Sequence, residues 1–122
     1  MSDTLEVIHD VTVLLCGADG AVLRGERDAS DLIGDAFSQG AAWVAVPVER
    51  IGEDFFTLRT RVAGDIVQKF ANYRLGLAVI GDITAHTEAS TALGDFVRES
   101  NQGRQLWFVP DVDTLRMRLA VR

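Results

Sequence analysis

Residues 42–46 read AWVAV, and residues 75–80 read LGLAVI. Neither stretch alternates apolar with polar side chains, and the two stretches end at Pro47 and at Gly81. Continuous apolar runs of this length are typical of strands that are buried on both faces of a parallel sheet. A further β-prone run, residues 105–109 (QLWFV), ends at Pro110. The sequence therefore predicts a central parallel sheet, with Trp43 and Trp107 in its core.

Segments with helical periodicity lie between these strands. Apolar residues from Leu32 to Phe37 are spaced for one face of a helix that begins near residues 28–31 and ends at Gly40. The longest predicted helix covers residues 53–73, where apolar residues recur every three or four positions. Two more helices are predicted, over residues 88–101 and 111–121.

Gly64 lies inside the predicted long helix. Glycine in a helix interior costs about 1 kcal/mol relative to alanine, so it usually marks a packing or functional constraint. We expect a close approach at Gly64, with a contact to the sheet as the first interpretation.

The first 23 residues predict a β-hairpin. Residues 5–15 are rich in β-prone side chains, residues 16–20 (CGADG) have turn chemistry, and residues 21–23 form a second short run. The predicted order is β-β-α-β-α-β-α-β-α, in which alternating units form right-handed parallel crossovers. We therefore expect a single α/β sandwich domain over residues 1–122, mostly parallel with an N-terminal hairpin.

Composition excludes several classes of protein. The chain has 122 residues, 48% of them apolar, and its 12 basic against 18 acidic side chains give a net charge of −6. No Lys/Arg stripe is present to bind nucleic acid, and no apolar run reaches the 18 residues of a membrane span. The single cysteine, Cys16, cannot form an internal disulfide, and we expect a cytoplasmic protein.

Four segments, in the same order along the chain, resemble an uncharacterised bacterial family named domain of unknown function 4180. They are residues 31–34 (DLIG), 58–74 (which include LRTRVAGDIVQKF and NYR), 78–82 (AVIGD) and 95–101 (DFVRESN). The resemblance covers nearly the whole chain. It implies no catalytic residue, because the family has no established activity.

The element order is also similar to that of the sulfate-transporter and anti-sigma-antagonist (STAS) domain. This resemblance implies a small module that binds partner proteins and is switched by phosphorylation of a hydroxyl at a helix start. Thr57 is the hydroxyl nearest to that position here and follows Phe55 and Phe56, while Thr60 is a second hydroxyl nearby. The resemblance therefore implies Thr57 as the phosphorylation site.

Polar residues are frequent on the predicted long helix and at the end of the next one. They are Arg59, Thr60, Gln68, Lys69, Asn72, Tyr73, Glu99 and Asn101. Helix-end interactions explain many of these residue types, and a surface for a protein partner explains the same set. Because no nucleophile, base and oxyanion donors occur together, we expect a non-catalytic binding or regulatory module that docks a protein partner through these residues.

The loops after the parallel strands provide the alternative, a small-molecule sensor or enzyme. Ligands favour the carboxyl ends of parallel strands, where Asp54, Asp82 and His86 are expected. Carboxylates in these loops are also typical helix caps, and no metal-ligand spacing accompanies them, so no metal or cofactor is expected.

A homodimer is a further expectation. The N-terminal hairpin is the predicted sheet edge, and two such edges can pair across a two-fold axis. A subunit that only assembles with itself is the third functional possibility.

Overall fold

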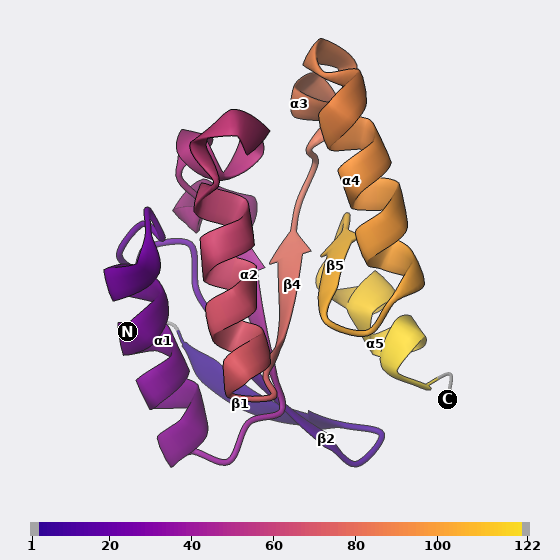
Figure 1. The fold of residues 1–122 in the computed structure, drawn as a ribbon. Helices are drawn as coiled ribbons and strands as arrows, with labels where there is room; N and C mark the ends of the chain where they lie inside the picture. Colours follow the sequence, from indigo (N-terminus) through magenta and orange to yellow (C-terminus); the bar gives the residue numbers. More distant parts are fainter. Residues whose placement is uncertain (1–2, 121–122) are drawn as a thin grey trace.

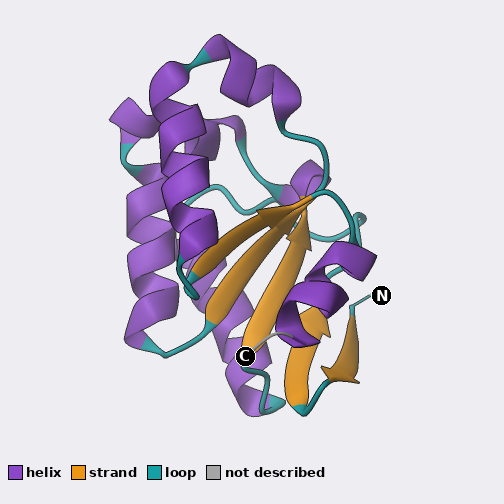
Figure 2. Ribbon diagram, turned by 90° about the vertical axis from the view of Figure 1, so that its right-hand side faces the viewer, coloured by secondary structure: helices purple, strands orange, loops and turns teal. Residues whose placement is uncertain are grey.

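The computed structural model describes residues 3–120. Five strands form one sheet in the order β1-β2-β3-β4-β5 (Figure 2). They are β1 (Thr4–Ile8), β2 (Val11–Leu15), β3 (Trp43–Pro47), β4 (Gly76–Ile80) and β5 (Leu106–Val109). β1 pairs with β2 in antiparallel fashion, and every later pairing is parallel. The predicted α/β class, with a mostly parallel sheet and an N-terminal hairpin, is confirmed.

Helices cover both faces of this sheet. They are α1 (Glu26–Ser38), α2 (Val62–Asn72), α3 (Thr84–Ala89), α4 (Thr91–Gln102) and α5 (Val112–Ala120). Because strand order follows chain order, right-handed crossovers place α1, α2 and α4 on one face, where they lie in a row (Figure 1). α5 lies on the opposite face (Figure 2).

Two hydrophobic cores, one on each face of the sheet, explain why the strand sequences do not alternate apolar with polar residues. Val44 and Val46 of β3 face the row of helices, whereas Trp43 and Ala45 face α5. The rings of Trp43 and Trp107 stack with their centroids 4.2 Å apart, and both residues are buried. The indole N–H of Trp107 donates to the carbonyl oxygen of Gly103 at 2.7 Å. The predicted burial of both tryptophans is confirmed.

The hairpin lies earlier in the chain than predicted. His9 and Asp10 have φ values of 49° and 69° and form a tight turn that splits residues 5–15 into β1 and β2. Ile8 pairs with Val11, so the connection has two residues, and two positive φ angles match the right-handed twist of a hairpin. The run at residues 21–23 forms no strand, because Leu23 makes only an isolated bridge with Ile51.

The prediction of one helix over residues 53–73 is wrong. The segment after β3 forms three 3-10 turns, η1 (Val48–Arg50), η2 (Glu53–Phe56) and η3 (Leu58–Thr60). The hydroxyl of Thr60 donates to the carbonyl oxygens of Asp54 and Thr57 at 2.7 and 2.8 Å, and Arg61 then adopts a left-handed φ of 65°. α2 begins only after this break.

The helix predicted over residues 88–101 is also divided. Ser90 separates α3 from α4, and its hydroxyl accepts the N–H of Leu93 at 3.2 Å as an N-cap. Gly103 ends α4, as predicted. α1 begins at Glu26, earlier than expected, and its Phe37 is exposed although the periodicity placed it inward.

The glycine that a close approach requires is Gly76 rather than Gly64. A Cβ atom at Gly64 would have no neighbour within 4 Å, so the expected close contact is absent. At Gly76, which pairs with Trp43 across the sheet, a Cβ atom would overlap the indole ring of Trp43. The stacked tryptophans therefore depend on glycine at this position of β4.

We expect Gly76→Ala to destabilise the protein by about 1–3 kcal/mol, because the added methyl group must displace a packed aromatic ring. Gly64→Ala is the matched control and should stabilise the protein by about 0.4–1 kcal/mol, because a Cβ atom has open space there and alanine lowers the entropy of the unfolded chain at this position in the first turn of α2. Chemical denaturation of both variants measures the two free energies. A neutral Gly76→Ala substitution would show that the tryptophan stack does not constrain the sheet.

Candidate functional site

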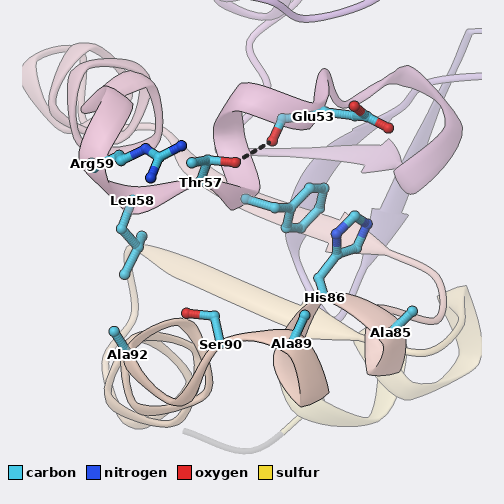
Figure 3. Close-up of a pocket in the computed structure, with 10 residues that line it drawn as sticks. Glu53, Thr57, Leu58, Arg59, Ala85, His86, Ala89, Ser90 and Ala92 are labelled. Atoms are coloured by element: carbon cyan, nitrogen blue, oxygen red, sulfur yellow. Dashed lines mark hydrogen bonds between the residues drawn. The ribbon is translucent and has the colours of Figure 1, made fainter.

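A groove of about 600 Å³ lies beyond the carboxyl ends of β3 and β4 (Figure 3). One wall comes from η2 and η3, and the other from α3 and the start of α4. The second wall presents the small side chains of Ala85, Ala89 and Ala92, which leave room between the walls. We call this space the rim groove.

Two aromatic rings form part of the rim groove. Phe56 and His86 stack nearly parallel, with ring centroids 4.1 Å apart and an interplanar angle of 9°. Phe55, the neighbour of Phe56, is fully buried and contacts Phe108 edge to face in the core. Both phenylalanines of η2 belong to the core, and Phe56, only 7% exposed, lies at the floor of the groove under the His86 ring.

Arg59 is the positively charged side chain of the groove wall. Its guanidinium is exposed and has no hydrogen bond or ion pair within residues 3–120. The Thr57 hydroxyl donates to the carbonyl oxygen of Glu53 at 3.5 Å within the same wall (Figure 3). Thr57 precedes η3, whereas α2 begins at Val62.

The three residues expected at the rim do not form one site. His86 lines the rim groove, and Asp82 lines a separate depression of about 300 Å³ beside Phe108. The Asp82 carboxylate accepts both the N–H and the hydroxyl of Thr84, and these hydrogen bonds lower its pKa. Asp54 is exposed and lines neither space. Within the described part of the chain, no group of three His, Cys, Asp or Glu residues could hold a metal ion.

A second surface lies on the outer side of α1 and α2. Phe37 and Tyr73 are 65% and 51% exposed, and their rings meet edge to face with centroids 6.3 Å apart. Both rings line an apolar depression of about 270 Å³, together with Ser30, Ile33 and Gly34. α1 and α2 are parallel crossover helices, so their carboxyl ends lie side by side and bring these rings together.

A more polar depression of about 450 Å³ adjoins the first one at Tyr73. It is lined by Gln68, Lys69 and Asn72 together with the acidic residues Glu26 and Asp65. The Gln68 amide donates to the side-chain oxygen of Asn72 at 2.9 Å. We call the two depressions together the α1–α2 face.

The structure divides the predicted partner-binding residues among three places. Gln68, Lys69, Asn72 and Tyr73 lie together on the α1–α2 face, whereas Arg59 lines the rim groove and Thr60 stabilises the turns beside it. Glu99 and Asn101 lie on α4.

Asn101 has a structural role. Its side-chain oxygen accepts the N–H of Phe108 at 2.7 Å, and its carbonyl oxygen accepts Arg118 at 2.6 Å. Asn101 therefore joins α4 to β5 and α5.

Arg50 and Cys16 form a polar cluster that the sequence did not reveal. Arg50, only 8% exposed, donates to the carbonyl oxygens of Ala21 and Gly17 at 2.9 and 3.1 Å and pairs with the Asp3 carboxylate at 3.2 Å. Cys16 lies beside this cluster. Burial raises the pKa of the Cys16 thiol to about 12, the negative charge of Asp3 adds to the shift, and Arg50 opposes it. The thiol is therefore protonated at neutral pH and is no nucleophile.

We expect Cys16 to react slowly with a thiol reagent at pH 8 in the native protein and rapidly in denaturant. The folded pKa lies above the ordinary value of 9.0, so its contribution to stability is complete below pH 9 and is lost as the pH rises toward 12. Denaturation of the native chain and of Cys16→Ala across pH 8–11 measures this difference. Equal pH dependence of the two proteins would contradict the assignment.

Fold and surfaces together define a small α/β domain with an open five-stranded sheet, a rim groove and an exposed aromatic pair. The chain matches the family model described as Domain of unknown function (DUF4180) over residues 8–119, and it belongs to that family. No curated protein and no solved structure matches the chain. The similarity to the STAS domain therefore rests on element order alone and is not confirmed. None of the described helices is long and apolar enough to cross a membrane.

Proposed function

We propose that this domain is a non-catalytic module that docks a partner protein through the α1–α2 face. The observation that carries the proposal is the pair of large aromatic side chains, Phe37 and Tyr73, which stand together in solvent. Aromatic residues are enriched at the energetic centres of protein interfaces, because they bury a large area at a low cost in side-chain entropy. Five large hydrophobic residues of the described chain are exposed, and these two are in contact with each other.

The backbone of α1 supports the same proposal. Gly34 lies in the middle of α1, and a Cβ atom there would have no neighbour within 4 Å. No contact among residues 3–120 requires this glycine, although it weakens the helix. Ser30 and Ser38 lie one turn before and one turn after it, so a partner segment can approach α1 closely beside Phe37.

The chemistry of the face indicates what the partner presents. The depression beside Phe37 is apolar and can receive an aliphatic or aromatic side chain. Lys69, in the adjoining depression, has no ion pair within residues 3–120, and Asn72 lies beside it. Because Glu26 and Asp65 line the same depression as Lys69, it offers charges of both signs and hydrogen-bonding amides. A partner segment with one apolar side chain and a neighbouring polar side chain fits both depressions.

We expect Phe37→Ala and Tyr73→Ala each to weaken capture of the partner by roughly tenfold or more, the loss typical of an interface hot spot. Both side chains are exposed, so the melting temperature should change little. Affinity capture from a lysate of the native host, quantified by mass spectrometry, measures the loss. Met117→Ala is the matched control, because Met117 is 71% exposed on α5, away from this face. Capture of the same proteins by all three variants would contradict the proposal.

The rim groove supports a second candidate function, the sensing of a small acidic ligand. Arg59 offers a guanidinium that has no ion pair within residues 3–120, and the half-buried His86 ring, which stacks on Phe56, offers an aromatic surface in the same groove. A planar carboxylic acid would place its acid group on Arg59 and its ring on the apolar wall.

For this second function, we expect benzoate at millimolar concentration to shift the NMR signals of the His86 ring in the native protein. Arg59→Ala should abolish the shift, whereas Lys69→Ala should preserve it, because Lys69 lies outside the groove. An unchanged His86 spectrum would exclude aromatic carboxylates as ligands.

A further inference from the structure

β1 is an open edge of the sheet. It pairs with β2 on one side, and no other strand of the described chain pairs with its outer side (Figure 2). Such an edge presents backbone N–H and C=O groups that can pair with another strand. β1 lacks several of the protections that proteins use at open edges, and its charged residue, Glu6, is paired with Arg116. β1 (TLEVI) contains no proline or lysine, and its five pairs with β2, from Thr4–Leu15 to Ile8–Val11, run without a bulge.

Two aliphatic side chains stand exposed on one face of this edge. Leu5 and Val7 are 43% and 67% exposed. Leu5 lies opposite Leu14, which belongs to the core under α1, α2 and α4, so both side chains point to the helix-covered face of the sheet. They therefore extend the apolar surface of that face to the rim of the molecule.

We propose that β1 pairs with β1 of a second copy of this chain, in antiparallel fashion, about a two-fold axis at Glu6. This pairing places Leu5 opposite the partner's Val7, and Val7 opposite the partner's Leu5, so the four exposed aliphatic side chains bury one another. The two five-stranded sheets become one continuous sheet, with the helix rows of both copies on the same face.

The register follows from the positions of the exposed side chains. A shift by one residue would place Leu5 opposite Glu6 of the second copy. Leu5 and Glu6 point to opposite faces of the sheet, so the aliphatic side chains of the two copies would not meet. A shift of the axis to Leu5 or to Val7 would leave one aliphatic side chain of each copy opposite Asp3 or His9. Pairing about Glu6 is the register in which both aliphatic side chains find aliphatic partners.

Arg116 pairs with Glu6 at the axis, and the same guanidinium also pairs with the exposed Asp113 carboxylate at 2.7 Å. The two Glu6 carboxylates would face each other, which is unfavourable for free carboxylates. Each one, however, accepts two hydrogen bonds from Arg116 of α5, at 2.7 and 2.9 Å. The two carboxylates and two guanidinium groups can therefore alternate around the axis, on the face opposite to the aliphatic cluster.

The test combines sedimentation equilibrium with a charge swap in the full chain. We expect a dimer for the native sequence, and a dissociation constant at least tenfold higher for Leu5→Glu and for Val7→Lys. The double variant L5E/V7K should restore the dimer, because the two-fold axis places each new glutamate opposite a new lysine. Met117→Lys is the matched control, since it adds the same charge at an exposed apolar position on α5. Circular dichroism confirms folding of each variant.

Three results would overturn the proposal. The first is a native chain that stays monomeric at all concentrations, and the second is a dimer that Val7→Lys does not weaken. The third is a double variant that stays monomeric although it is folded, because this would contradict the register. The docking proposal for the α1–α2 face is independent of all three, since β1 contributes no residue to that face.

Discussion

The buried guanidinium of Arg50 fixes the path of the loop between β2 and α1, and this loop determines where α1 begins. Among the described residues Arg50 is the only charged side chain that is buried, and a buried charge without hydrogen-bond partners would cost several kcal/mol. Its partners come from the loop between β2 and α1 and from Asp3. The Leu23 N–H also donates to the Arg50 carbonyl oxygen at 2.6 Å. The loop is thereby drawn across the carboxyl end of β3, and Gly20 is required there because a Cβ atom would overlap the guanidinium.

The strands were predictable because a simple physical property determines them. A segment such as residues 42–46 is covered on both faces, and this leaves a continuous apolar run that no exposed helix or loop shows. Helix continuity was not predictable in the same way. Phe55, Ile66 and Phe70 are all fully buried in one core, so their spacing correctly predicted which side chains are buried. The same spacing did not predict that the backbone leaves the helical conformation at Arg61. The left-handed backbone conformation of Arg61 and the hydrogen bonds of the Thr60 hydroxyl do not alter the spacing of the apolar residues, so the sequence pattern did not reveal them.

The candidate sites were predicted only in part, because the spacing of apolar residues shows neither where a helix breaks nor which side chains at its edge are exposed. Arg59 and Asn72 were predicted on one long helix, but the break at Arg61 leaves Arg59 on the turns of the rim groove and Asn72 at the end of α2. Phe37 was missed because its spacing nearly matches the inward face of α1, but it lies at the edge of this face and is exposed, whereas Ala36 beside it is fully buried. The interpretation of carboxylates in the loops after the strands as helix caps is supported at Asp111. Its carboxylate accepts the N–H and the hydroxyl of Thr114, both at 2.7 Å, at the start of α5.

The strand order has a consequence for how this chain folds during synthesis. Each strand pairs with its neighbour in sequence, so the sheet can grow by one strand at a time as the chain leaves the ribosome. The face with Trp43 and Trp107 stays open throughout, because its cover is α5, the last helix. Docking of α5 joins Arg116 to Glu6 of the first strand. A nascent chain therefore exposes its tryptophan pair to chaperones until its final helix has emerged.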